Sequence, residues 1–393
     1  MLAQTYISIL NPNVPKVRLY TKTQFNPQTN IFGILDREQH RQKRRLYGII
    51  LPSRSLRTFE LTMSREGDVF LRLILNTAGR PIDVAIALSA TWPLLRQLNK
   101  KNGASFVKAI RAIVERRMVL PKNAKRDFYS IAADKSISGN IISPGQSQLR
   151  VEPVLFLPAG KSSSAFFYLS RYASVYIRLA SEIRQTVPSG SDIEVTILLS
   201  RCKYLCAVIN KFMTMSPPFL GTFWREPYTA FSEPFVVDEH IIPRCTIVEV
   251  NPYCMMYNEE YFSRSSELCS ERWLESKEGM PEDLYEKAQR ATTRVAFAPF
   301  ALGGIGCLVI AKTLWYFDFY KAPREVGKLR EGLPGSRDGR HLRDKYQLYD
   351  LLVAGHHGPT LVFTRRGELG EKLRTNPQSS KATCRLNLPF LAL

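Results

Sequence analysis

The segment FAPFALGGIGC, residues 297–307, combines one cysteine with three closely spaced glycines. A cysteine thiolate is both a nucleophile and a soft metal ligand. Glycines at 303, 304 and 306 carry no side chain, so the backbone there can pass close to a flat or bulky group. Free cysteines are also among the most buried residues of proteins, so inert packing of Cys307 is the competing interpretation.

Two further motifs could do chemistry, and neither has its full pattern. LFLPAGKSS, residues 155–163, ends like a phosphate-binding loop, but Leu155 stands where the first glycine belongs. His356 and His357 would point to opposite sides of a strand, and no third ligand follows at metal-binding spacing. Neither G-x-S-x-G nor H-E-x-x-H occurs. The sequence therefore favours no nucleotide, zinc or common hydrolase site.

The composition is that of a basic globular protein. Of 393 residues, 45% are apolar, and 55 Lys and Arg against 35 Asp and Glu give a net charge of +20. This charge favours an acidic partner, such as nucleic acid, anionic lipid or an acidic protein, and a solvated helix face is the alternative. No nucleic-acid-binding module accompanies the basic clusters, so a nucleic-acid binder is the weakest of the hypotheses. The clusters lie at residues 37–45 and 111–126.

Cysteine content and hydropathy indicate a reducing compartment and no membrane span. Seven cysteines, an odd number in a long chain, argue against a disulfide framework. The N-terminal sequence resembles neither a signal peptide nor an anchor. The apolar run ALGGIGCLVIA, residues 301–311, is about half of the ~20 residues that a spanning helix needs.

The pattern of apolar residues predicts a mainly α fold with a minor antiparallel β-sheet. Residues 36–75 read as two helices separated at Pro52, and residues 151–187 as one long helix or as a strand, a turn and a helix. Asp238 and Glu239 would join a strand pair. The other expected elements are helices at 103–120 and 204–218, a linker at 136–147 and a surface loop at 322–345.

Several segments, in this order along the chain, resemble the cytochrome P450 family of heme-thiolate monooxygenases, particularly its fungal secondary-metabolism members. In the family's F-x-x-G-x-R-x-C loop, Phe300, Gly303 and Cys307 fall in register, while Ile305 replaces the arginine. SERWL, residues 270–274, resembles the P-E-R-W motif, with Arg272 as its arginine. The resemblance implies a P450-like domain over residues 36–367 with internal deletions and therefore an incomplete fold. Residues 1–35 would be an N-terminal segment without a membrane anchor, and residues 368–393 a C-terminal tail.

The resemblance also implies a heme cofactor and its ligands. Cys307 would be the axial thiolate of the heme iron, with Phe300 and Gly303 shaping its loop. HRQKRR, residues 40–45, resembles the family's C-helix, so His40 and Arg44 would lie one turn apart and contact a heme propionate. PAGKSSSAFFY, residues 158–168, resembles the oxygen-activating helix, in which Ser163 would take the catalytic threonine's place.

The chain departs from the family at further places. Lys211 and Thr214 occupy the positions of the E-x-x-R pair, so Lys211 would leave like charges facing each other at Arg272. Ser162 stands where an acid belongs, so a proton relay has no evident acid. Directly after Cys307 the chain continues with LVIAKTLWYFDF, which skips the first turns of the helix that normally follows.

The activity implied by the resemblance is insertion of one oxygen atom from O2 into an apolar small molecule. Electrons would come from an NADPH-dependent reductase, whose acidic face suits a basic partner, and nucleic acid would have no role. Family members are membrane-associated at the cytosolic face of the endoplasmic reticulum, and without an anchor the expected location is the cytoplasm. The alternative is a non-catalytic remnant of the same family that acts as a binding or scaffold protein.

Overall fold

A computed structural model describes the helical and sheet core of the chain. The described residues are 34–50, 53–91, 119–121, 159–217, 235–237, 239–243, 245–274, 293, 296–297, 304–336, 340–351, 353–355 and 357–367. The helix expected at 103–120, apart from its last two residues, and the linker expected at 136–147 lie outside them.

The helix pair predicted at the start of the domain is present. Helix α2 spans Arg37–Ile50 and α3 spans Ser53–Leu75, with the break at the predicted proline. The side chain of Asp36 accepts a hydrogen bond from the Gln39 amide at 2.8 Å, which satisfies an amide in the first turn of α2. The short helix α4, Val84–Thr91, begins in the same way, because Asp83 accepts from the Ile86 amide.

Four helices follow in the next described stretch, α8 (Ala159–Leu169), α9 (Ala173–Thr186), α10 (Val195–Arg201) and α11 (Lys203–Met215). The sequence left two alternatives for residues 151–187. The structure describes this region from residue 159, and from there it forms two helices joined by a tight turn. The carboxylate of Glu182 accepts from the amides of Tyr204 and Leu205, both at 2.8 Å, and so caps the start of α11. The two prolines predicted to stop this helix begin at Pro217, directly after its end.

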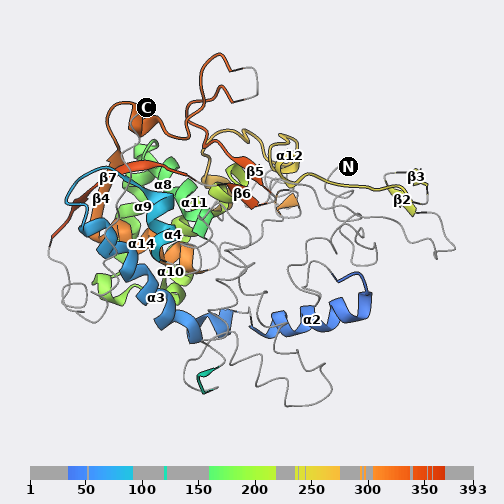
Figure 1. Cartoon of the computed structure of the whole chain (residues 1–393), viewed down its shortest axis with the longest axis horizontal. Helices are drawn as coiled ribbons and strands as arrows, with labels where there is room; N and C mark the ends of the chain where they lie inside the picture. Colours follow the sequence, from blue (N-terminus) through green and yellow to red (C-terminus); the bar gives the residue numbers. More distant parts are fainter. Residues whose placement is uncertain are drawn as a thin grey trace, which may run out of the picture.

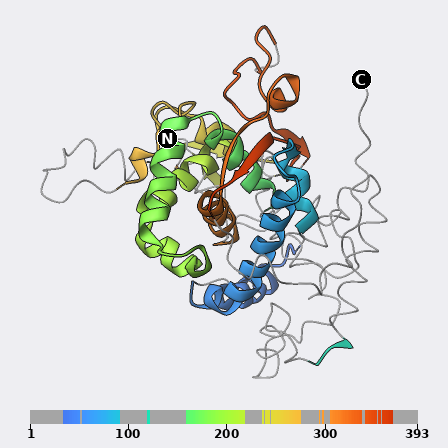
Figure 2. The ribbon, with the colours of Figure 1, turned by 90° about the vertical axis from the view of Figure 1, so that its left-hand side faces the viewer.

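Helix α14, Gly304–Tyr316, lies at the centre of the helical core. It packs against α3, α8, α9 and α10, and Figure 2 shows it between the green helices and the blue α3. A helix that is apolar on all of its sides is expected to be buried in this way. Aromatic rings fill the adjoining space, with Phe166 at 5.8 Å from Phe70 and 5.2 Å from Phe319 between ring centroids.

Three small antiparallel sheets complete the described fold, as Figure 1 shows. Strand β4 (Phe317–Lys321) continues directly from α14 and pairs with β7 (Thr360–Arg365), with Phe319 opposite Phe363. Strand β1 (Ile82–Asp83) pairs with the other edge of β7. The predicted strand pair is β2 (Phe235–Val237) with β3 (His240–Ile242), and β5 (Tyr349–Leu351) pairs with β6 (Val353–Gly355). The predicted class, mainly helical with minor antiparallel sheet, is confirmed.

Short elements surround a second, smaller apolar cluster. Helix α12 (Pro252–Met256) and the 3-10 helix η6 (Glu271–Trp273) lie beside it, and η6 packs against α11. The other 3-10 helices are η5 (Gly190–Asp192) and η7 (Glu325–Lys328). The 3-10 helix η7 lies within the described part of the surface loop predicted at 322–345.

Candidate functional site

Cys307 lies in the first turn of helix α14. Gly304 and Gly306 belong to the same turn. The cysteine is 3% exposed and belongs to the main apolar cluster. The apolar residues after Cys307 favour burial of the whole segment among its neighbours.

The thiol of Cys307 is held neutral by its surroundings. Burial, with a smaller contribution from the nearby thiol of Cys206 on α11, raises the pKa of Cys307 to about 12. Helix N-termini favour a thiolate, but here the loss of solvation outweighs that effect.

These observations decide whether the described residues fit a heme at Cys307. An axial thiolate must present its sulfur to an open face as wide as the porphyrin ring. The thiol of Cys307, 3% exposed in the described arrangement, does not present such a face. The arrangement described here therefore does not fit heme, and no reaction step is assigned through it.

Ser163 is fully buried on α8 and is held by a hydroxyl partner. Its side chain hydrogen-bonds Tyr346, whose pKa is raised to about 12 by burial and moderated by this bond. The Tyr346 hydroxyl also lies 3.0 Å from the carbonyl oxygen of His357 and 3.2 Å from that of Gly358. Ser163 thus lies in a polar contact between α8 and the segment that leads into β7.

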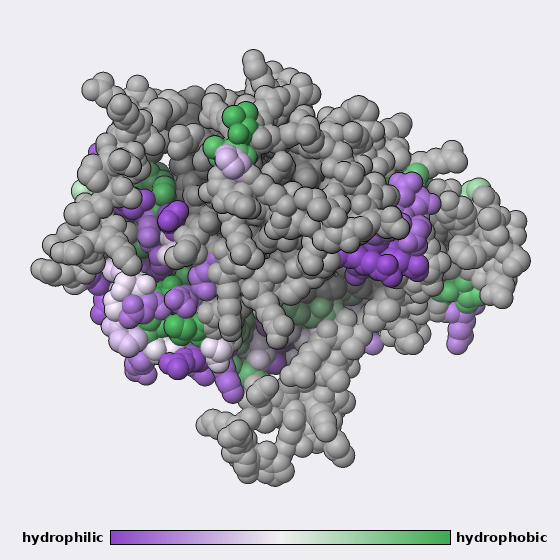
Figure 3. Space-filling model, turned by 90° about the horizontal axis from the view of Figure 1, so that it is seen from below, coloured by the Kyte–Doolittle hydropathy of each residue, from purple (hydrophilic) through white to green (hydrophobic). Residues whose placement is uncertain are grey.

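The residues expected at a heme propionate lie on α2. His40 is half-buried, Arg44 is exposed, and the helix places them one turn apart as predicted. Figure 1 shows α2 beyond the end of α3, to the side of the helices around α14. Hydrophilic side chains gather at its position in Figure 3. Phe300 and Gly303, the other expected heme-loop residues, lie outside the described residues.

Lys211 and Arg272 form the most unusual polar feature of the described core. Lys211, on α11, is 1% exposed and donates from Nζ to the carbonyl oxygen of Ser265 at 2.8 Å. Burial first, and the charge of Arg272 second, lower the pKa of Lys211 to about 7. Arg272 thus acts on Lys211 as the like charge expected from sequence. Thr214 is satisfied within its own helix, because its hydroxyl donates to the Lys211 carbonyl at 2.7 Å.

Arg272 and its neighbour on η6 carry buried donors without an acceptor. Arg272 donates from Nη2 to the carbonyl oxygen of Ser263, while its Nε is buried and unpaired among the described residues. The indole nitrogen of Trp273 is in the same condition, and its ring packs 4.3 Å from that of Phe297. Sequence identified Arg272 by its motif but gave no signal for the carbonyl groups of Ser263 and Ser265 that receive these cations.

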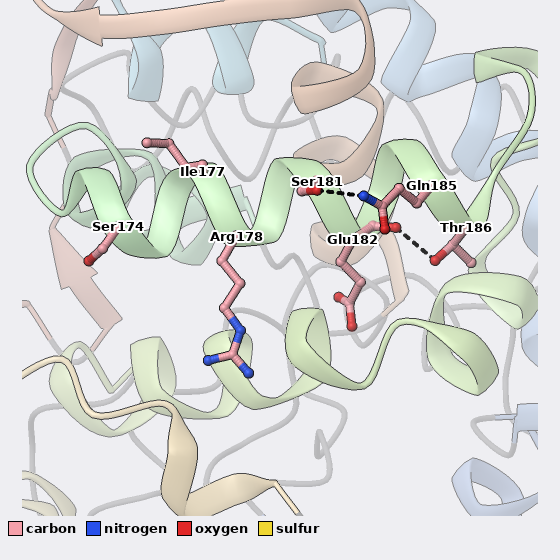
Figure 4. A pocket seen from close by; sticks show the side chains of 7 residues that line it. All are labelled: Ser174, Ile177, Arg178, Ser181, Glu182, Gln185 and Thr186. Carbon is pink, nitrogen blue, oxygen red and sulfur yellow. Dashed lines mark hydrogen bonds between the residues drawn. The ribbon is translucent and has the colours of Figure 1, made fainter.

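A shallow groove of about 540 Å3 runs along the outer side of α9, as Figure 4 shows. Arg178 and Glu182 project from the helix on the same side. The guanidinium of Arg178 pairs with Glu271 at 3.0 Å and lies 3.9 Å from the centre of the Tyr204 ring. Since Glu182 caps α11, both charged side chains of the groove hold neighbouring elements together.

The described residues contain neither a metal cluster nor a membrane-spanning helix. Within these ranges no group of three or more His, Cys, Asp or Glu side chains could hold a metal ion. No helix in the described part of the chain is long and apolar enough to cross a membrane. The six cysteines that the structure describes are all free.

Comparisons with known proteins give a consistent family. The family model for cytochrome P450 matches residues 94–308. A cytochrome P450 monooxygenase of Gibberella zeae is 28% identical over 298 residues, which are 70% of this chain and 65% of that protein. The cytochrome P450 monooxygenase poxM of Penicillium oxalicum is 26% identical over 66% of this chain and 48% of its own length. The cytochrome P450 monooxygenase apf7 of Gibberella fujikuroi is 30% identical over 62% of this chain and 47% of its own length. The chain thus spans about half to two thirds of these relatives.

Proposed function

The chain belongs to the cytochrome P450 family, and from that premise we propose that it is a divergent member whose cysteine ligand has been displaced into the helical core. In this state the protein does not present a thiolate to heme. It acts as a binding or scaffold protein of the monooxygenase fold rather than as an oxygenase.

One observation carries this proposal, the burial of Cys307 within α14. The helix runs without interruption from Gly304 to Tyr316 and leads straight into β4. By comparison with the family pattern the chain skips the first turns of the helix after the cysteine, which supports this position of Cys307 at the start of α14.

The contact between Lys211 and Arg272 supports the same conclusion. Where the family pattern has a carboxylate beside the arginine, this chain has the buried Lys211, whose pKa is lowered to about 7 by burial and by Arg272. Replacing an ion pair by two like charges removes an attraction and leaves the cost of desolvation. The segment around η6 is thus less firmly fixed to α11 than the family pattern requires.

A second candidate is an active heme-thiolate monooxygenase, which inserts one oxygen atom of O2 into an apolar small molecule with electrons from an NADPH-dependent reductase. The observation in its favour is that the family match runs through Cys307 and ends at residue 308. The first turn of a helix is also a setting that favours a thiolate when the site is open. The relatives named above are described as monooxygenases.

One experiment separates the two candidates. The full chain is produced with a heme precursor, reduced and treated with carbon monoxide, and its difference spectrum is recorded beside that of Cys307→Ala. The first candidate predicts no thiolate-type Soret shift in either protein. A shift in the wild-type protein that is absent from Cys307→Ala would establish the monooxygenase instead.

A further inference from the structure

Tyr349, the first residue of β5, has two arginine side chains from the preceding surface segment over its ring. The guanidinium carbon of Arg330 lies 4.5 Å from the ring centre, and that of Arg340 lies 4.2 Å from it. Cation–π contacts of this kind hold the ring and both side chains together. Figure 1 shows the segment that carries the arginines as the orange loop projecting from the helical core. Tyr349 is nevertheless 48% exposed, so other proteins can reach it.

Within the described residues, both arginines have neutral hydrogen-bond partners and no ion pair. Arg330 donates from Nε to the carbonyl oxygen of His357 at 3.1 Å and from Nη1 to that of Gln347 at 3.3 Å. Arg340 donates from Nη2 to the carbonyl oxygen of Leu348 at 3.5 Å. A guanidinium group carries five N–H donors, so each arginine keeps donors for a further acceptor. Carbonyl groups accept these bonds without neutralising the two charges.

The carboxylates that the structure describes in the same segment act on other cations. Glu325 pairs with Lys328 at 2.6 Å, and Glu331 pairs with Arg171 at 2.8 Å. Asp344 also acts on Arg171 as an opposite charge. A negative group added beside Tyr349 would therefore meet two guanidinium groups that pair with none of these carboxylates.

The hydroxyl of Tyr349 is a point at which such a group can be attached to the chain. A phosphoryl group on tyrosine adds a charge of about −1.5 to −2 at pH 7 and three strong acceptor oxygens. The planar guanidinium group of arginine matches phosphate through paired N–H donors. The arginines contact the ring on an open surface, and covalent attachment keeps the phosphate there at a high effective concentration. This arrangement favours an attached phosphate over a small free anion.

We propose that Tyr349 is a phosphorylation site and that Arg330 and Arg340 bind its phosphoryl group. The co-reactants are ATP and a tyrosine-directed protein kinase. The bond from the γ-phosphorus to the β,γ-bridging oxygen breaks, a bond from that phosphorus to Oη of Tyr349 forms, ADP leaves, and the hydroxyl proton passes to the base of the kinase. The bound phosphate ties both arginines of the loop to β5. This modification requires no heme, so the inference goes beyond the proposed function.

The first test asks whether Tyr349 accepts a phosphoryl group in the folded protein. The full chain is incubated with ATP and a tyrosine kinase of broad specificity, and the modified residues are identified by peptide mass spectrometry. Tyr349 should be phosphorylated. A Tyr349 that stays unmodified would overturn the proposal.

The second test asks whether the arginines bind the phosphate. Phosphotyrosine is incorporated during translation at position 349 in one protein and at position 320 in another, because Tyr320 is 52% exposed and is a matched control. Phosphorus NMR follows the second pKa of each phosphate, which is ordinarily about 6. Nearby guanidinium groups favour the dianion, so the pKa at position 349 should be lower than at 320 by about half a unit. Equal pKa values would overturn the site.

Removal of the arginines assigns the difference to them. Arg330→Gln combined with Arg340→Gln should abolish the difference in pKa between positions 349 and 320. Arg324→Gln combined with Arg343→Gln removes the same charge at two exposed positions of the segment and should keep the difference. If the first double variant does not fold, Arg340→Gln alone decides the question and should roughly halve the difference. A difference that survives unchanged in either arginine variant of the site would overturn the proposal.

Discussion

Lys312 of α14 and Asp68 of α3 form a buried ion pair with 2.5 Å between Nζ and Oδ1. The hydroxyl of Ser64 completes the contact at 2.7 Å from the same ammonium group. Lys312 is 4% exposed, so the pair fixes the register of α14 against α3. Because Cys307 lies on α14, this pair also helps to hold the cysteine in the core.

Asp68→Ala removes the counter-charge of Lys312. We expect a loss of about 3–5 kcal/mol in the free energy of unfolding, since a buried ammonium group is left unpaired. Urea unfolding measures this loss in the free energy of unfolding. Adding Lys312→Met to the same chain should recover most of the loss, and a double variant as unstable as Asp68→Ala would contradict the assignment.

Glu331 is the hub of a second charged network. It pairs with Arg171 at 2.8 Å and with Lys321 at 2.5 Å, and the side chains of Arg171 and Glu331 are 6% and 11% exposed. Burial alone would raise the pKa of Glu331, but the hydrogen bonds from Lys321 and Arg171 hold it below the ordinary 4.5. Glu331→Gln should cost about 3–5 kcal/mol at neutral pH.

The lowered pKa gives this loss a defined pH dependence. The stability that ionised Glu331 contributes is complete above the ordinary carboxyl pKa and is lost as the pH falls through the lowered value in the folded protein. The difference between wild-type and Glu331→Gln proteins, followed by urea unfolding from pH 7 to pH 3, should therefore shrink below about pH 4.5. A difference that stays constant over this range would contradict the network.

Lys211 should have the opposite effect on stability. Its pKa in the folded protein is about 7 against an ordinary 10.5, so the unfolded chain binds its proton more tightly between these values. Stability then rises with pH from about 7 towards 10.5, and the penalty of the buried charge is complete below about 7. Lys211→Met should be more stable than wild type at pH 7 in urea unfolding, with an advantage that declines by pH 9.5. An advantage independent of pH would show that Lys211 is not buried as a titrating cation.

Ser163 should contribute to folding through its contact with Tyr346. Ser163→Ala is expected to cost about 1 kcal/mol, because the buried Tyr346 hydroxyl loses one partner. In a Tyr346→Phe background the same substitution should cost much less, as measured by a double-mutant cycle in urea. If the stability losses of the two substitutions were additive, Ser163 and Tyr346 would not interact, and Ser163 would have another role.

Much of the fold follows from sequence pattern and turn chemistry. The break at Pro52, the end of α11 at its prolines and the β2–β3 hairpin were predicted because proline, glycine and strict alternation act locally. The position of Cys307 was not predictable in this way. Its glycines resemble a loop motif, and the helix forms because α3, α8, α9 and α10 bury the apolar residues that follow.

The polar contacts also differ in whether the sequence predicts them. The approach of Lys211 to Arg272 was predicted from the family motifs, since both residues occupy motif positions. The pairing of Arg171 with Glu331, 160 residues apart, leaves no local signal in the sequence. Contacts of this kind depend on how the helices pack, so only the structure provides them.

The position of Cys307 is tested most directly by its reactivity in the folded protein. The full chain is treated with iodoacetamide at neutral pH, with and without added hemin, and each cysteine is followed by peptide mass spectrometry. Cys245 and Cys254 are exposed and serve as internal controls that react rapidly. The account predicts that Cys307 stays unmodified until the protein unfolds and that hemin changes nothing. Modification of Cys307 at a rate near that of Cys245, together with protection by hemin, would contradict it and show an open heme-ligand site.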